Sequence, residues 1–97
     1  MTPCQKRGRA RLMLRLPLWR AAFQHSSGQN FLDVCEAYDL AYVGLDHWIR
    51  SDRPIRSDMI AEYRELMASL EFEAQICLAP EVKAKETVPE AVTEVLH

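Results

Sequence analysis

The sequence predicts an all-α protein in which residues 30–78 form an antiparallel two-helix hairpin. Dimerisation would complete this hairpin into a four-helix bundle, with flexible extensions at both ends of the chain. Three observations lead to this fold class. Apolar residues recur at spacings of three and four along two long segments, a proline-containing break separates these segments, and a basic stretch and a proline-punctuated stretch flank them.

The first helix is expected to begin near Asn30, because an asparagine side chain can accept a hydrogen bond from an N–H of the first turn. Its apolar stripe consists of Phe31, Val34, Cys35, Tyr38, Ala41, Tyr42, Leu45, Trp48 and Ile49. On the opposite face we expect Asp39 and Asp46 to face solvent. Gly44 weakens the helix by ~1 kcal/mol relative to alanine and would allow a close helix approach.

The second helix is expected after a short break that contains Pro54, since this residue disfavours helical geometry at Arg53. A connection this short usually makes two helices antiparallel neighbours. The second apolar stripe is formed by Met59, Ile60, Tyr63, Leu66, Met67, Leu70, Ala74 and Cys77. The pattern runs to about Leu78, and Pro80 is predicted to end the helix.

A hairpin of this size has little interior, so its wide apolar stripes need a further covering surface. Pairing with a second hairpin, or docking on a larger protein, would supply one. Phe72 lies between two glutamates, off the stripe, where an exposed aromatic ring can anchor a partner. The candidate interface residues are therefore Tyr42, Trp48, Tyr63, Met67 and Phe72.

Residues 1–29 form a basic N-terminal arm. They hold six basic residues and no acidic one, a charge of +6, whereas the six basic and 14 acidic residues of the remainder give −8. Arg7, Arg11, Arg15 and Arg20 lie beside Leu12, Leu16, Trp19 and Phe23, a pattern typical of an amphipathic helix that Pro17 would kink or end.

Three interpretations of the arm remain open. It is a poorly ordered extension, a cleavable targeting peptide, or a segment that binds nucleic acid or an anionic membrane. Translation starting at Met13 would leave residues 1–12 out of the protein. Any contact with nucleic acid would have to come through this arm, because the second helix is acidic.

Residues 79–97 are predicted to be a disordered, low-complexity tail. Its last stretch can form a short helix that presents Val92, Val95 and Leu96. An isolated helix of this length is only marginally stable in water. Docking of this stretch on a partner is the alternative. The Glu94-to-His97 spacing resembles that of a di-iron ligand pair, but in such a tail it is interpreted as a chance match.

The sequence offers no motif for catalysis, a cofactor or a metal. It contains no CxxC pair, no HExxH and no glycine-rich phosphate loop. His47 is interpreted as a surface residue near a helix end, and Cys35 and Cys77 as small apolar side chains at one end of the hairpin. No apolar run reaches the ~20 residues that a membrane-spanning helix needs.

These observations favour a small non-catalytic helical module for protein–protein interaction or regulation, which pairs with itself or with a larger protein. An accessory subunit whose targeting arm is removed after import is the alternative, and an unrecognised enzyme is the second alternative. A reducing compartment fits the unpaired cysteines, so we expect the cytoplasm, or an organellar matrix if the arm directs import.

Overall fold

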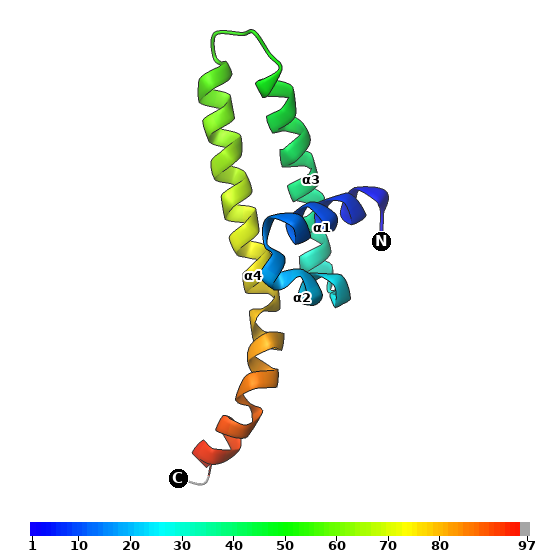
Figure 1. Ribbon diagram of the computed structural model, residues 1–97, viewed down its shortest axis with the longest axis vertical. Coiled ribbons are helices and arrows are strands. Elements are labelled where there is room, and N and C mark those ends of the chain that lie inside the picture. The colour runs from blue at the N-terminus through cyan, green and yellow to red at the C-terminus, as the bar shows by residue number, and fades with distance from the viewer. Residues whose placement is uncertain (96–97) are drawn as a thin grey trace.

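The computed structural model describes the backbone of residues 1–95 and the side chains of residues 1–78. Within these residues the protein is all-helical, which confirms the expected class. The elements are α1 (Pro3–Arg15), the 3-10 helix η1 (Pro17–Trp19), α2 (Arg20–His25), α3 (Gln29–Ile49) and α4 (Arg56–Val95). Helix α3 and the first half of α4 lie side by side and run in opposite directions, while α1 crosses α3 (Figure 1).

The N-terminal arm is folded against the rest of the chain. Thr2 begins α1 with a capping box, in which its hydroxyl accepts from the Gln5 N–H while the Gln5 side chain accepts from the Thr2 N–H. Helix α1 ends at Arg15, because Pro17 disfavours helical geometry at Leu16, whose φ is −125° and ψ 71°. The chain then turns through η1 into α2.

The core lies where α1 and α2 meet the α3–α4 pair. Leu12 of α1 and Phe23 of α2 are both fully buried, and the Phe23 ring stacks on Phe31 of α3 with centroids 5.3 Å apart. The remaining buried apolar residues are Val34, Cys35, Tyr38, Ala41, Leu70, Ala74 and Leu78. The arm therefore supplies part of the cover that the apolar stripes of α3 and α4 require.

Glycines permit two close contacts. A Cβ atom on Gly8 would fall on the backbone carbonyl of Cys35, so only glycine lets α1 approach α3 this closely. A Cβ atom on Gly44 would collide with the ring of Tyr63 across the α3–α4 interface. The expected role of Gly44 in close helix approach thus has a specific partner, whereas the tighter contact at Gly8 was not anticipated.

The first long helix begins within one residue of the predicted start, but its predicted cap and the predicted end of the second long helix are wrong. Helix α3 begins at Gln29 with Gly28 as its N-cap, so Asn30 does not cap it. Helix α4 continues through Pro80 and Pro89 to Val95 instead of ending near Leu78. A proline removes one backbone hydrogen bond and bends a helix without always ending it, and the distal part of α4 curves in Figure 1. The side chains of the predicted tail, including its Val92–Leu96 stretch and the Glu94–His97 pair, lie outside the described residues.

Candidate functional site

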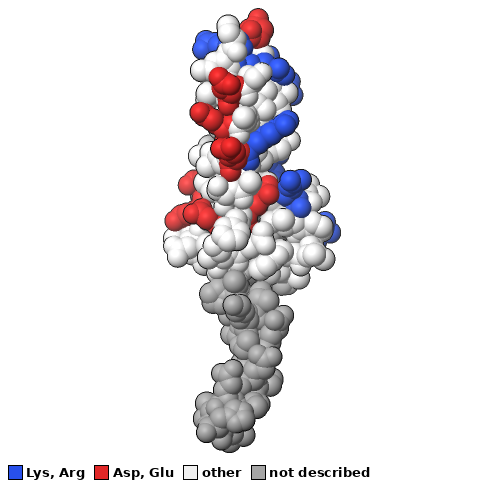
Figure 2. All heavy atoms as spheres, turned by 90° about the vertical axis from the view of Figure 1, so that its left-hand side faces the viewer, with Lys and Arg blue, Asp and Glu red and all other residues white. Residues whose placement is uncertain are grey.

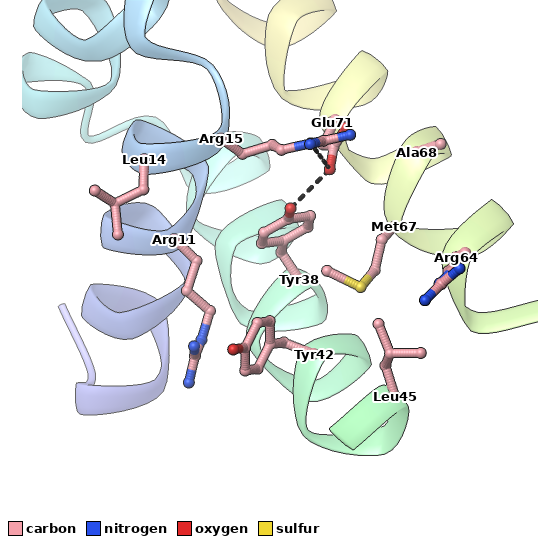
Figure 3. Close-up of a pocket in the computed structure, with 10 residues that line it drawn as sticks. All are labelled: Arg11, Leu14, Arg15, Tyr38, Tyr42, Leu45, Arg64, Met67, Ala68 and Glu71. Carbon is pink, nitrogen blue, oxygen red and sulfur yellow. Dashed lines mark hydrogen bonds and ion pairs between the residues drawn. The ribbon is translucent and has the colours of Figure 1, made fainter. Parts of the chain in front are cut away.

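A groove of about 640 Å³ opens on the face where α1 meets the α3–α4 pair (Figure 3). Its apolar surface comes from all three helices, and four charged side chains stand around it. The lining residues are Arg11, Leu14, Arg15, Tyr38, Tyr42, Leu45, Arg64, Met67, Ala68 and Glu71. Three arginines against one glutamate make the groove an apolar surface with an excess of positive charge.

Asp39 fixes one wall of this groove by binding α1. Its carboxylate accepts hydrogen bonds from Arg7 Nε at 3.2 Å, from Arg11 Nε at 3.1 Å and from the Cys4 thiol at 3.3 Å. The Asp39 side chain is only 2% exposed. The expectation that Asp39 faces solvent is therefore wrong, because α1 covers the face of α3 that helical periodicity had assigned to water.

The environment of Asp39 favours its charged form. Burial by itself would raise the pKa of this carboxyl, but the hydrogen bonds from Arg11, Cys4 and Arg7 outweigh that effect and lower the pKa. A buried carboxylate is tolerated because charged and polar donors surround it. Deprotonation of Asp39 and the contact between α1 and α3 therefore stabilise each other.

Glu71 of α4 makes the second link to α1. Its carboxylate accepts a hydrogen bond of 2.7 Å from the Tyr38 hydroxyl and forms an ion pair of 3.4 Å with Arg15 Nε. Burial and the hydrogen bond to Glu71 raise the pKa of the Tyr38 phenol well above its usual value. Residues from α1, α3 and α4 thereby meet at one corner of the groove, drawn with dashed lines in Figure 3.

The middle of the groove combines aromatic and cationic surface. The Arg11 guanidinium carbon lies 3.6 Å from the ring centroid of Tyr42, a cation–π contact. Arg11 therefore serves two purposes, since it also binds Asp39. Tyr42 remains 41% exposed beside Leu45 and Met67. Arg64 stands on the α4 wall and forms no ion pair with another side chain of residues 1–78.

The structure brings together only some of the predicted interface residues. Tyr42 and Met67 line the groove, whereas Tyr63 packs against Gly44. Trp48 is half-buried near the end of α3, with its ring 5.3 Å from that of His47. Phe72 is 64% exposed and lies outside the groove. These five residues thus occupy different surfaces and do not form one site.

Sequence reasoning missed the polar corner of Arg15, Tyr38 and Glu71 and the place of Arg64 in the groove. Periodicity assigned Tyr38 to the apolar stripe, and Glu71 and Arg64 to a solvated face. The available signal was the surplus of arginines at four-residue spacing in the arm together with isolated acids on the two helices. A surplus of this kind indicates ion pairs between segments, but it does not identify which acid pairs with which arginine.

Half of the six basic residues of the arm form ion pairs within the chain. Arg7 and Arg11 pair with Asp39, and Arg15 pairs with Glu71. Arg20 remains exposed. Because Asp39 and Glu71 offset part of the charge of +6, the arm offers less free positive charge to nucleic acid or to an anionic membrane than its sequence suggests.

The cysteines are all in the thiol form. Burial raises the pKa of Cys35 to about 12 and raises that of Cys77, so both thiols favour the protonated state. Over the part of the chain that is described, no three His, Cys, Asp or Glu side chains gather in a way that could hold a metal ion. In that same part, each helix is too short or too polar to cross a membrane.

The geometry thus presents an apolar groove with basic rims, built by three helices and anchored by two buried or half-buried acids. Comparison of the chain with protein-family models, with curated proteins and with solved structures finds no match.

Proposed function

We propose that this protein is a non-catalytic helical module for protein–protein interaction, and that the groove between α1, α3 and α4 receives an acidic, amphipathic helix of a partner protein. The observation that carries the proposal is the lining of the groove, in which apolar side chains are flanked by Arg11, Arg15 and Arg64. Arg11 and Arg15 are paired with Asp39 and Glu71, so Arg64 supplies the positive charge that remains for a partner. Charge complementarity of this kind favours an acidic partner and excludes basic ones.

The spacing of the lining residues supports a helical occupant. The lining residues recur at helical spacings of three and four on both helices. On α3 they are Tyr38, Tyr42 and Leu45, and on α4 they are Arg64, Met67, Ala68 and Glu71. These residues form ridges, and a ridge of a further helix packs between such ridges. The occupant would place apolar side chains on Met67 and Leu45 and a carboxylate near Arg64.

The arm supports this function by completing the groove. Arg11, Leu14 and Arg15 of α1 form one wall, and Asp39 and Glu71 hold that wall in place. Removal of the arm would take this wall away and expose Asp39, which favours the interaction module over an accessory subunit with a cleaved arm. The dimeric four-helix bundle remains part of the proposal, as does a reducing compartment such as the cytoplasm for the three thiols.

A designed peptide tests the groove directly. The probe is a fluorescent helical peptide with leucines at positions one, four, five and eight and glutamates beside them, and the control replaces each glutamate by lysine. We expect the acidic peptide to bind the full chain and to shift NMR signals of Met67 and Leu45. Arg64→Glu should weaken that binding about tenfold, the effect of a close charge pair of ~1.4 kcal/mol.

The matched control is Arg53→Glu, because Arg53 is exposed in the connection between α3 and α4, away from the groove. It changes net charge by the same amount as Arg64→Glu and should leave peptide binding unaltered. Equal binding of acidic and basic peptides, or signal shifts confined to residues outside the groove, would overturn the proposal.

A further inference from the structure

The face of α4 that points away from α3 carries an exposed row of apolar and small residues. Phe72 is 64% exposed and Ile76 is 52% exposed, four residues apart on one side of the helix. We call this surface the outer face of α4, defined by Ala61, Glu65, Ala68, Ser69, Phe72 and Ile76, all of which are exposed. Glu65 is the one charged residue among them. Two large apolar side chains with small residues before them form a flat surface on which a second helix can pack closely.

The two long edges of this outer face have opposite charge. Glu62 and Glu73 are exposed along one edge, and Arg64 lies on the other, next to Arg15 of α1 at the groove. Figure 2 looks onto this face and shows, below the connection between α3 and α4, acidic side chains mostly towards one side and basic side chains towards the other. Glu71, which pairs with Arg15, is the exception on the basic side.

A surface with one acidic and one basic edge is complementary to itself in only one orientation. Rotation by half a turn about an axis parallel to α4 brings the acidic edge of one copy onto the basic edge of the other. Rotation about the perpendicular axis in the same plane places like charges opposite each other, which is unfavourable. Two-fold pairs are the commonest protein assemblies, and each uses one patch against itself.

We propose that the outer face of α4 pairs with the same face of a second copy of this chain, with the two α4 helices parallel and the two-fold axis along them. In this dimer Phe72 and Ile76 pack against their counterparts at the seam, and Arg64 of each copy lies opposite Glu62 or Glu65 of the other. The dimer rests on the proposed role as an interaction module. Its apolar seam, Phe72 and Ile76, lies outside the groove, whereas Arg64 and Ala68 border both surfaces.

Sedimentation of the full chain over a range of concentrations measures the pairing. We expect a dimer whose dissociation constant rises with salt, because the charged edges contribute to it. Phe72→Glu should weaken dimerisation about 30-fold, as loss of a central anchor does. Circular dichroism should remain unchanged, because Phe72 is exposed in the single chain. The matched control is Val43→Glu, since Val43 is 54% exposed on α3 and takes no part in the outer face.

Charge reversal tests the edges. Glu62→Arg combined with Glu65→Arg replaces by bases the two acids that lie opposite Arg64 in the dimer, and Arg64→Glu replaces that base by an acid. Each variant alone should dimerise about tenfold more weakly than the unaltered chain, and an equimolar mixture of the two should regain the affinity. Undiminished dimerisation of each separate variant would overturn the pairing of the edges.

The distance between two labels tests the orientation. A nitroxide attached through an unnatural amino acid at Ser57, which is exposed at the start of α4, leaves the native cysteines in place. Parallel helices hold the two labels close together, whereas an antiparallel pair centred near Ala68 separates the backbones by about 30 Å at 1.5 Å per residue.

Three results would overturn the inference. They are a long distance between the labels, a chain that is still monomeric at about 100 µM, the range of dissociation constants of weak complexes, and a dimer whose affinity Phe72→Glu does not change. The groove is assayed separately. Phe72→Glu should leave binding of the acidic peptide intact, so the failure of one proposal can be distinguished from the failure of the other.

Discussion

The two halves of the α3–α4 pair are packed differently. In the half beside α1 and α2, buried residues run from Phe31 to Ala41 on α3 and from Leu70 to Leu78 on α4. Between residues 42 and 69, which form the other half and the connection, no side chain is buried. Ile49, Ile55 and Leu66 are all more than 40% exposed there. Two helices alone bury only part of their apolar surface, and the arm completes the burial at one end.

The two halves also contribute differently, because one half stabilises the fold and the other half carries the proposed binding surface. The half covered by α1 and α2 contains the stacked rings of Phe23 and Phe31 and the buried carboxylate of Asp39. The other half carries Tyr42, Leu45 and Arg64, which form much of the groove. We therefore expect substitutions in the covered half to change the free energy of unfolding and substitutions in the open half to change interactions.

The largest effect should come from Phe31, which is 1% exposed at the junction of α2 and α3. Phe31→Ala should lower the free energy of unfolding by about 3–5 kcal/mol, because it removes buried surface and leaves a cavity. Urea unfolding followed by circular dichroism measures this change. Trp48→Ala, in the open half, should cost less than half as much because Trp48 is only half-buried. Equal losses would remove the distinction between the two halves.

The next effect should come from Gly8, where any Cβ atom meets the backbone of Cys35. Gly8→Ala should destabilise the protein by about 3 kcal/mol, the upper end for overpacking, since a backbone cannot rotate aside as a side chain can. The rate of hydrogen exchange of the α1 amides should increase in the Gly8→Ala variant. Gly28→Ala is the control, because nothing lies within 4 Å of its Cβ position. It should cost no more than ~1 kcal/mol, the usual penalty for alanine at an N-cap, since Gly28 caps α3. A harmless Gly8→Ala would show that α1 does not contact α3 here.

A smaller effect is expected from Asp39→Asn, which keeps the shape of the side chain but removes the charge that binds Arg7 and Arg11. The loss should be about 2 kcal/mol, as for hydrogen bonds to charged groups. Asp46→Asn is the matched control, since Asp46 forms an exposed pair with Arg50 on the same helix. That pair should contribute only a few tenths of a kcal/mol by the usual value for i,i+4 pairs. Thermal unfolding of both variants side by side would compare the two.

The smallest effect concerns pH. Since the folded state lowers the pKa of Asp39 below its ordinary value of 3.8, its contribution is present above that value and is lost as pH falls through the folded pKa. The unaltered chain should therefore lose its advantage over Asp39→Asn on acidification below about pH 4, near the reference pKa of aspartate. Unfolding curves at several pH values measure the gap. A gap that stays constant down to the lowest pH would contradict the assigned role of Asp39.

The amino-acid sequence by itself determined the features that depend on neighbours in the chain. Helical periodicity predicted α3 and the first half of α4, and Pro17 marked the end of α1, because these features arise from hydrogen bonds and steric limits within a few residues. The exposure of Phe72 also agrees with its predicted place off the apolar stripe. Tyr42 and Met67 are the two predicted interface residues that the groove includes.

Only the tertiary structure decided what covers each face. Asp39 lies on the polar side of α3, yet it is buried because Gly8 lets α1 approach and because Arg7 and Arg11 reach its carboxylate. Pairing between residues about 30 positions apart leaves no periodic trace in a single sequence, since many acids could satisfy the same arginines. The groove has the same origin, because its walls belong to three helices whose crossing is set by packing and not by local propensity.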